Sequence, residues 1–225
     1  HSLNVTVLSV VMGTALGLSR NTIYELAVGA LVHDTGKMFE PKEILHKPSR
    51  LTEEEFEEIK KHSELGYRYL CANFDIPEDS KIATLQHHEK YNGNGYPNGL
   101  SGKNIHEFGR IISVADVYDA LTSDRPYRKA MLPSDAIEYI MGGYGTIFDP
   151  TIVKAITQKV APYPIGTCVR LSTGQEAIVV KNYESTSLRP LVRLIKDGKP
   201  SNECIDLTSD RSSLNITVRE IINLG

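Results

Sequence analysis

Residues 87–97, with the sequence HHEKYNGNGYP, place two adjacent histidines directly before the segment of the chain that a helix tolerates least. We expect a helix that is capped by Asp79 or Ser80 and runs to His88. It has to end there, because glycine loses much backbone freedom in a helix and proline lacks the N–H group that a helix needs. The fold must therefore hold a helix end that carries two imidazoles against a tight loop. A hydrophobic core has no use for that combination, whereas a metal site beside a substrate loop requires both parts.

The composition is that of an ordinary globular protein, with 225 residues, 40% hydrophobic and 24% charged, and a formal net charge of −3. Without a basic excess, binding of a nucleic acid polymer is not indicated. The cysteines (Cys71, Cys168 and Cys204) stand far apart and form no CxxC pair, which indicates free thiols in a reducing compartment and predicts a cytoplasmic location. The uncharged run 2–19 reaches the lower edge of membrane-spanning length, but its apolar residues recur at helical spacing between polar ones. That spacing favours an amphipathic core helix.

Apolar residues recur at helical spacing through the first two-thirds of the chain. Residues 22–25 (TIYE) and 52–55 (TEEE) both have the spacing of a capping box, in which Thr and Glu satisfy the first backbone amides of a helix. Further helices are expected over residues 111–121 and from Ser134 and Pro150. The helix that opens at the second capping box is expected to continue past His62, with an inner face that includes Phe56, Ile59, Tyr67 and Leu70.

From about residue 163 the pattern changes to short runs rich in β-branched residues, which favour strands. These runs are 169–171, 177–180 and 191–195, and turns are expected at Gly174 and at 197–198. We therefore expect a mainly α protein, with a helical domain over residues 1–162 and a small β-rich appendage over residues 163–225.

Imidazole and carboxylate side chains recur on the inner faces or at the ends of four expected helices: His33, Asp34, His62, His87, His88 and Asp116. Each residue alone also has an ordinary explanation. His62 could be a hydrogen-bonded core histidine, Asp116 could pair with Lys37 or Arg110, and a helix end tolerates exposed histidines. Together they indicate a metal site, because a buried carboxylate such as Asp116 is costly unless it is paired or metal-bound. Imidazole and carboxylate without thiolate favour iron, manganese or another first-row ion over a structural zinc site.

The set His33-Asp-Thr-Gly-Lys37, His62, His87-His-Glu89, Gly95-Tyr-Pro97 and Asp116, in this order, resembles the HD-GYP family, a branch of the HD phosphohydrolase superfamily. The stretches KPSRLTEEEFEEIKKH, RIISVADVYDALTSDRPYRKA and FDPTIV are similar to the same family. YPIGTCVRLSTGQEAIVV is similar to the tail that often follows these domains. The resemblance covers nearly the whole chain. It implies an HD-domain helical bundle that acts as a metal-dependent phosphodiesterase on cyclic di-GMP.

The resemblance also implies roles for individual residues. Asp34 is implied to bridge two divalent ions, and a third ion occurs in some members with help from a glutamate whose position would precede His1. Lys37 matches a phosphate-contacting lysine, and residues 95–97 match the substrate-side loop. The implied metal ligands are His1, His33, Asp34, His62, His87, His88 and Asp116. The implied catalytic residues are His33, Asp34 and Lys37, and those implied to bind substrate are Lys37, Gly95, Tyr96 and Pro97.

Physical chemistry is consistent with these roles. Divalent ions held by Asp34 would lower the pKa of a water molecule and neutralise the phosphoryl oxygens. Lys37, one helical turn beyond His33, could add a positive charge. Arg125 and Arg128 follow Asp116 and could bind a second phosphate, although surface solubility explains them equally well.

Three functions remain open at this stage. The first is hydrolysis of cyclic di-GMP to linear pGpG and onward to GMP. The second is hydrolysis of another nucleotide, such as cyclic GMP-AMP or a nucleoside polyphosphate. The third is a sensor module that binds the dinucleotide or a diguanylate cyclase (GGDEF) partner without turnover. We expect a sensory or receiver domain upstream of this chain, which would make it the cytoplasmic part of a longer, membrane-attached or receiver-linked protein.

The family usually has Asp where this chain has Asn92, so we expect the loop to persist with altered polarity near the metals. Glu89 is expected to orient a ligand histidine. The glycines at 93 and 95 are expected to let the backbone turn and approach the substrate, and Tyr96 offers a ring for guanine.

Overall fold

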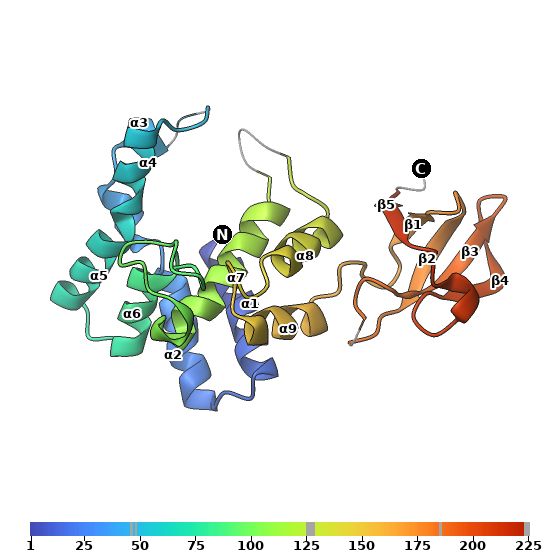
Figure 1. Ribbon diagram of the computed structural model, residues 1–225, viewed down its shortest axis with the longest axis horizontal. Helices are drawn as coiled ribbons and strands as arrows, with labels where there is room; N and C mark the ends of the chain where they lie inside the picture. The colour runs from blue at the N-terminus through green and yellow to red at the C-terminus, as the bar shows by residue number, and fades with distance from the viewer. Residues whose placement is uncertain (46, 48, 125–128, 185, 223–225) are drawn as a thin grey trace. The chain divides into compact units, whose positions relative to one another are not determined.

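The computed structural model describes residues 1–45, 47, 49–124, 129–184 and 186–222 (Figure 1). It confirms a mainly α chain with a small antiparallel sheet at the C-terminal end. The chain divides into two compact units, residues 1–131 with 139–155 and residues 132–138 with 156–225. The domain boundary expected between residues 162 and 163 stays a prediction.

The first unit contains the helices that surround the histidines. Its elements are α1 (Ser2–Ala15), α2 (Arg20–Val32), η1 (Thr35–Phe39), α3 (Lys42–Leu45), α4 (Glu53–Lys60), α5 (His62–Asn73), α6 (Glu78–Gln86), η2 (Gly102–Asn104) and α7 (Glu107–Thr122). The chain passes from one unit to the other just before α8 (Pro133–Gly142), within α8 and within α9 (Pro150–Lys159).

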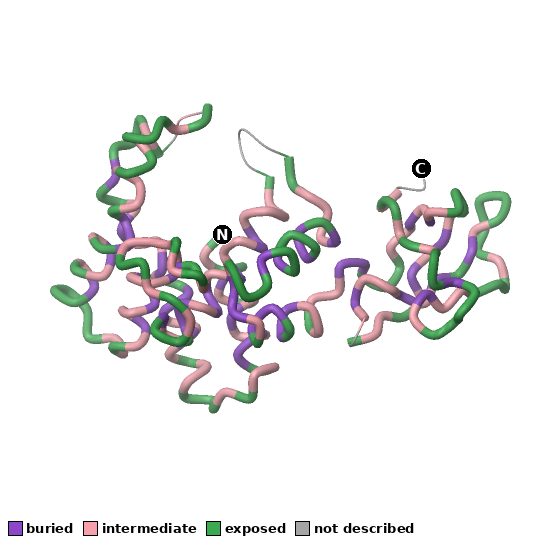
Figure 2. The backbone as a smooth tube through the Cα atoms, in the orientation of Figure 1, coloured by how far each residue is buried: buried purple, intermediate pink, exposed green. Residues whose placement is uncertain are grey.

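Helix α7 lies at the centre of the first unit. It packs against α1, α2 and α6, and buried residues follow it along most of its length (Figure 2). Its buried positions include Ile111, Ile112 and Ala115, with no exposed surface, so the helix is held by apolar contacts on several sides. This environment surrounds Asp116, which follows directly in sequence.

Two expected helix starts are wrong and one is confirmed. The cap of α2 is Ser19, whose hydroxyl accepts from the Thr22 amide at 3.1 Å, so Thr22 lies inside the helix and not at its start. Helix α6 begins at Glu78 without a side-chain cap and ends at Gln86, so Asp79 and Ser80 do not cap it. The capping box at Thr52 is present with both of its hydrogen bonds.

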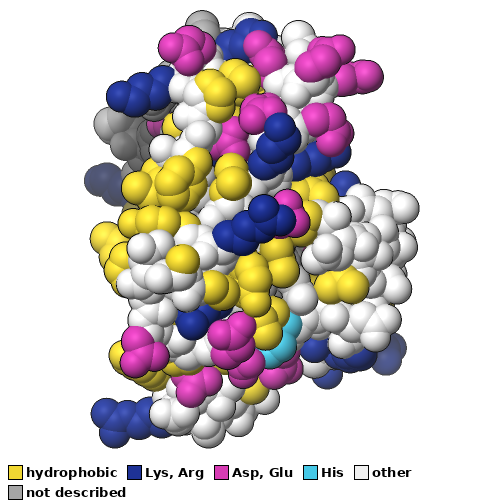
Figure 3. Space-filling model, turned by 90° about the vertical axis from the view of Figure 1, so that its left-hand side faces the viewer, with side chains coloured by type: hydrophobic (Ala, Val, Ile, Leu, Met, Phe, Trp, Pro, Cys, Tyr) yellow, Lys and Arg dark blue, Asp and Glu magenta, His cyan; other side chains and the backbone are white. Residues whose placement is uncertain are grey.

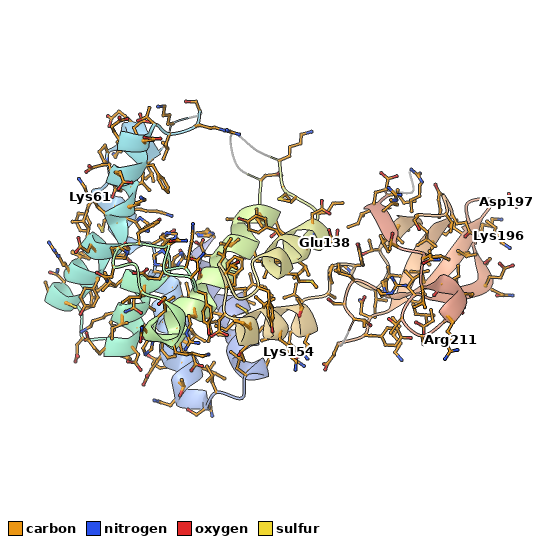
Figure 4. All side chains as sticks on the ribbon, in the orientation of Figure 1. Lys61, Glu138, Lys154, Lys196, Asp197 and Arg211 are labelled. Atoms are coloured by element: carbon orange, nitrogen blue, oxygen red, sulfur yellow. The ribbon has the colours of Figure 1, made fainter. Side chains whose placement is uncertain are left out.

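The single helix expected after Thr52 is wrong. The structure has two helices, α4 and α5, which are separated at Lys61 (Figure 4). Leu70 on α5 is buried as expected, but Phe56 on α4 is 45% exposed and does not belong to an inner face. The break places His62 at the first position of α5.

The second unit contains one antiparallel sheet with the strand order β4-β3-β2-β1-β5. The strands are β1 (Cys168–Leu171), β2 (Glu176–Lys181), β3 (Leu191–Lys196), β4 (Lys199–Asp206) and β5 (Val218–Ile221), and η3 (Arg211–Ser213) precedes the last. Alternate residues of β1 to β3 face one small core, in which Val169 pairs with Ala177 and Val179 pairs with Val192. The expected turns are present, at Gly174 with φ 85° and at Asp197 and Gly198 with φ 51° and 72° (Figure 4).

The N-terminal run is the helix α1, whose inner positions Val5 and Met12 have no exposed surface. Of the helices in the described part of the chain, none combines the length and apolar character that crossing a membrane requires.

The corrected cap of α2 gives a first prediction. Ser19→Ala should lower the free energy of unfolding by about 1 kcal/mol, because it leaves the Thr22 amide without its acceptor. Thr22→Ala is the matched control and should change it by less, because its hydroxyl meets only that of Ser19 at an exposed position. Urea unfolding of both variants measures the difference. A larger loss for Thr22→Ala would restore the original assignment of the cap.

Candidate metal centre

Asp34 follows the C-terminal end of α2 and opens the short helix η1. This short helix fits against α5 only because residue 36 is glycine. A Cβ atom on Gly36 would lie 1.8 Å from the backbone oxygen of His62 and 2.7 Å from the amide nitrogen of Gly66. Two segments that are distant in sequence therefore meet backbone to backbone, which brings Asp34 beside His62.

The two carboxylate oxygens of Asp34 face different histidines. Its Oδ2 lies 3.4 Å from His33 Nε2 and 3.6 Å from His1 Nε2. Its Oδ1 lies 3.5 Å from His62 Nε2 and 3.8 Å from His87 Nε2. One carboxylate thus contributes one oxygen to each of two neighbouring sets of imidazoles.

The possible ligand atoms form two groups, each with members within 4.8 Å of one another. The first group contains His1, His33 and Asp116, and the second contains Asp34, His62, His87 and His88. All seven expected metal ligands therefore lie in these groups, on segments from five parts of the chain.

Three of the histidines are held in the same way. The Nδ1 atoms of His33, His62 and His87 lie 2.7, 2.6 and 2.8 Å from backbone oxygens three residues earlier in the chain. A carbonyl oxygen only accepts, so each Nδ1 carries the ring proton and each Nε2 presents a lone pair. The accepting carbonyls belong to the last turns of α2, α4 and α6, where backbone oxygens lack partners within the helix.

The resulting arrangement fits divalent cations. The lone pairs of His62 Nε2 and His87 Nε2 face each other at 3.4 Å, and neither atom has a proton to donate to the other. His33 Nε2 and Asp34 Oδ1 are buried without a hydrogen-bond partner among the described residues. Buried acceptors that converge in this way cost free energy unless a cation or a donor lies between them.

His1 is held by three carboxylates. Its Nδ1 lies 2.7 Å from Asp119 Oδ2 and its Nε2 lies 3.2 Å from Asp116 Oδ1. Asp119 is 5% exposed and also accepts from the side chain of Asn4 at 2.8 Å. The Asp119 carboxylate thus orients the His1 ring from behind, as carboxylates commonly do for metal-ligating histidines.

The local environment sets the charge of these groups. Burial is the largest cause that lowers the pKa of His62, to about 4, and burial also lowers the pKa of His87 and His88. Burial opposes ionisation of Asp34 and Asp116, but hydrogen bonds from His1 hold the pKa of both carboxyls below the usual range. The same bonds, to Asp116 first and then Asp34, raise the pKa of His1 to about 10. At neutral pH the site therefore combines the neutral imidazoles of His62, His87 and His88 with the ionised carboxylates of Asp34 and Asp116, and His1 carries a proton that a bound cation would displace.

A family model described as the HD domain matches residues 2–152, which is more than half of the chain. The chain belongs to the HD domain family. The family resemblance found in the sequence is thereby confirmed. A second model, described as a KOW domain associated with the HD domain, matches residues 168–221 and covers strands β1 to β5.

Several known proteins are similar to this HD domain chain. A cyclic di-GMP phosphodiesterase of Pseudomonas aeruginosa is 36% identical over 194 residues, which are 86% of this chain and 47% of that protein. A 3'3'-cGAMP-specific phosphodiesterase of Vibrio cholerae is 42% identical over 131 residues, 58% of this chain and 30% of that protein. An HDG"Y"P protein of Bdellovibrio bacteriovorus shares the fold, with a TM-score of 0.57 at 23% identity over 69% of this chain and 50% of that one. The chain spans about half the length, or less, of these proteins.

In this HD domain, Lys37 contacts the candidate centre directly. Its Nζ is 2.6 Å from Asp34 Oδ2, and its side chain is 32% exposed. Arg110, an alternative partner for Asp116, pairs instead with Asp149. The two arginines expected to bind a second phosphate, Arg125 and Arg128, lie outside the described residues.

The loop after His88 is held by Glu89, whose expected role is wrong. The Glu89 carboxylate is buried and accepts from the amides of Asn98 at 2.8 Å and Leu100 at 3.0 Å, so it braces the loop and orients no histidine. The Tyr96 ring lies against the His88 ring at 4.8 Å between centroids, and the Tyr96–Pro97 peptide bond is cis. The loop therefore packs directly on a member of the second ligand group.

The glycines of this loop differ in role. Gly93 has a φ of 83° and makes the expected turn. A Cβ on Gly95 would lie 2.2 Å from the Lys90 amide, so the close approach at this position is to the protein's own backbone. Asn92 is exposed, and its Oδ1 accepts from the Asn94 amide at 3.0 Å, a role that Asp would fill equally well.

Sequence reasoning missed Gly36 and Asp119. Asp119 stands one helical turn after Asp116 on a strongly apolar helix, and this spacing is a signal that could have found it. Gly36 had no such signal, because the segment that it meets, at His62, is distant in sequence.

The contact of Gly36 gives a second prediction. Gly36→Ala should lower the free energy of unfolding by about 2–3 kcal/mol and reduce the metal content, because the new methyl group would overlap the His62 carbonyl. Gly142→Ala, on α8, is the matched control, because nothing lies within 4 Å of its added Cβ. Urea unfolding and elemental analysis of both variants provide the measurement. Equal metal content in the two variants would contradict this account.

The histidine pKa values give a third prediction, for protein freed of metal with a chelator. Its stability should fall as the pH falls from 6.5 to about 4, the window between the unfolded and folded pKa of His62. In that window the unfolded state binds more protons, because His62, His87 and His88 stay neutral in the fold. His62 alone, which is 1% exposed, contributes on the order of 3 kcal/mol.

His1 does not oppose this effect. Below pH 6.5 it is protonated in both states, and its stabilising contribution is lost only as the pH rises toward about 10. Unfolding free energies measured across the acidic window, for the parent and for His62→Gln, test the prediction. The variant should show the shallower dependence on pH, and equal slopes would exclude His62 as the cause.

Proposed function

We propose that this chain is a metal-dependent phosphodiesterase that opens a cyclic dinucleotide, with cyclic di-GMP as the principal substrate. The observation that supports this most directly is the position of Asp34, whose two oxygens face two separate groups of ligand atoms. A phosphodiester resists hydrolysis because its anionic oxygens repel nucleophiles and its leaving alkoxide is poor. Two cations on either side of one carboxylate address both obstacles.

The proposed cofactors are two divalent ions, iron or manganese. His1, His33 and Asp116 would hold one ion, His62, His87 and His88 the other, and Asp34 both. When bound, such ions lower the pKa of a water molecule and neutralise charge on the phosphoryl group. The donor set supports iron or manganese, because it contains nitrogen and oxygen atoms and no thiolate.

The side chains of the protein would position the phosphate. Lys37 holds its ammonium at the edge of the site, where it could donate to a phosphoryl oxygen and offset its charge. Burial, followed by the charges of Asp116 and Asp34, raises the pKa of the Tyr96 phenol. Tyr96 therefore keeps its proton at neutral pH and could donate a hydrogen bond.

A second candidate substrate is cyclic GMP-AMP. It is favoured by the similarity to a 3'3'-cGAMP-specific phosphodiesterase over 131 residues. The similarity to a cyclic di-GMP phosphodiesterase extends over 194 residues and supports the first candidate. A sensor without turnover is less well supported, because all seven expected ligands come together.

Other parts of the interpretation stay predictions. These are a third ion, the product pGpG or GMP, a diguanylate cyclase partner, a cytoplasmic location and the sensory or receiver domain upstream. We propose that the appendage over residues 163–225 packs against or contacts other parts of the protein or a partner. We also propose that the helical domain ends at residue 162.

A fourth prediction tests the proposed activity. Protein loaded anaerobically with iron or manganese should convert cyclic di-GMP to linear pGpG, and Asp34→Asn should reduce the rate at least about 100-fold, because the neutral amide cannot hold two cations. Chromatography of the products and elemental analysis of the metal measure the two effects.

The control is Asp75→Asn, which removes an exposed carboxylate that has no partner among the described residues. Its rate and metal content should equal those of the parent. Loaded protein that leaves cyclic di-GMP and cyclic GMP-AMP intact would rule out the proposed activity. An active Asp34→Asn variant would rule out the bridging role.

A further inference from the structure

A row of aromatic rings leads away from the second ligand group. The ring of Tyr96 lies 4.8 Å from that of His88, and the ring of Phe56 lies 6.4 Å from that of Tyr96, almost perpendicular to it. The ammonium of Lys60 lies over both outer rings, 4.9 Å from the centre of Phe56 and 5.6 Å from that of Tyr96. The row thus joins the candidate metal centre to helix α4.

Beyond Phe56 lies a cavity of about 430 Å³, large enough for part of a small-molecule ligand. Its apolar wall includes Ile44, Leu51, Phe56 and Ile59, and its polar lining includes Lys47 and Arg50. On the side of the molecule that carries α4 and α5, exposed hydrophobic side chains lie among Lys and Arg (Figure 3). The cavity is therefore apolar with a cationic edge.

The two cations of the cavity differ. The Lys47 ammonium is paired with both oxygens of the Glu55 carboxylate, at 2.6 and 2.8 Å. The Arg50 side chain is exposed and has no partner among the described residues. Arg50 is thus the cation whose donors are free for a ligand.

Phe56 is the aromatic residue among those that line this cavity. It is 45% exposed, although it stands on a helix whose capping box fixes its direction. Exposing a large aromatic ring to water is unfavourable. A planar aromatic ligand would cover the Phe56 ring by stacking on it, and this stacking would strengthen binding of the ligand. The ring, the apolar wall and the cationic edge together match a purine base.

We propose that this cavity is a purine subsite, in which Phe56 stacks with the base of a dinucleotide that is distal to the phosphate at the metals. This proposal rests on the proposed function. A cyclic dinucleotide carries its two bases on opposite sides of one macrocycle, and the two ring-to-ring steps from His88 to Phe56 provide such a separation. Lys60, whose ammonium is paired with Glu57 at 2.5 Å, lies along the path of the second phosphate and would exchange that partner for it.

Arg50 gives the subsite a preference for guanine. Guanine presents two acceptors on one edge, O6 and N7, which the donors of an arginine can meet together. Adenine has a donor in place of O6, so the same arginine makes one bond fewer. Cyclic di-GMP and cyclic GMP-AMP can each place a guanine here, whereas cyclic di-AMP cannot.

The chain contains no tryptophan, which allows a direct fifth test. Phe56→Trp keeps an aromatic face at the subsite and introduces a single tryptophan, which can be excited selectively over the tyrosines. Titration of metal-free Phe56→Trp protein with cyclic di-GMP should change the fluorescence to saturation, because the base stacks on the indole. Tyr24→Trp, at a 65% exposed position on α2, is the matched control and should not respond.

Kinetics and competition complete the test. Phe56→Leu should raise KM about tenfold with little change in kcat, because the base is held away from the reacting phosphate. Cyclic GMP-AMP should displace cyclic di-GMP from Phe56→Trp, whereas cyclic di-AMP should bind about tenfold more weakly. Adding Arg50→Ala should abolish that difference. Equal binding of cyclic di-AMP before this change would overturn the role of Arg50.

The outcomes separate this proposal from the proposed activity. Hydrolysis of cyclic di-GMP by Phe56→Trp without a fluorescence response, or an unchanged KM in Phe56→Leu, would overturn the subsite and leave the activity standing. A saturable response in protein that does not hydrolyse the ligand with either metal would support the subsite and contradict the activity. Urea unfolding of each variant confirms that the fold is intact, which is expected because Phe56 and Arg50 are exposed.

Discussion

The constraint that organises the helical unit is a set of buried lone pairs that converge on Asp34 and that the surrounding helices have to hold in place. The nitrogen atoms of His62 and His87 face each other and the same carboxylate oxygen, with no proton between them. Each unsatisfied buried acceptor costs about 1–3 kcal/mol, so this arrangement persists only because the surrounding helices hold it. Helix α7 contributes to that support through its contacts with α1, α2 and α6. The apolar core therefore provides the free energy that keeps an otherwise unfavourable polar cluster ready for cations.

The ends of helices are where this cluster can be built. The last turn of any helix has backbone oxygens without intrahelical partners, and a histidine placed just after it can donate its Nδ1 proton to one of them. His33 and His87 are the C-caps of α2 and α6, and each uses the oxygen three residues earlier. The carbonyl is satisfied and the imidazole is oriented by one bond. This explains why the chain puts histidines directly before the helix-breaking segment at 89–97: a helix has to end for its final carbonyls to become available.

The sequence predicted the ligands better than it predicted the elements that carry them. His33, Asp34 and His62 were found because their side-chain chemistry is recognisable without coordinates. The cap at Ser19 was missed because Thr22 has the capping-box spacing to Glu25, whereas the residue three positions after Ser19 is Thr22 and not a glutamate. Gly36 could not be recognised from the sequence. Its importance arises from a backbone contact with His62, which is distant in sequence, and no local pattern reveals such a contact. Local chemistry was readable, whereas contacts between distant segments were not.

The break between α4 and α5 connects these observations. In an uninterrupted α-helix the carbonyl of Ile59 would accept from the amide of Ser63. In the structure it accepts from a backbone amide at the end of α4 and from the ring of His62, and the Ser63 hydroxyl donates to the carbonyl of Lys60 at 3.0 Å. The helical spacing of the sequence favours continuity, and at the break the side chains of His62 and Ser63 add bonds to the backbone carbonyls at the end of α4. Its consequence is that His62 is aimed at Asp34 while α4 is free to take its own direction, with Phe56 toward Tyr96. One interruption thus serves both the ligand group and the aromatic row beside it.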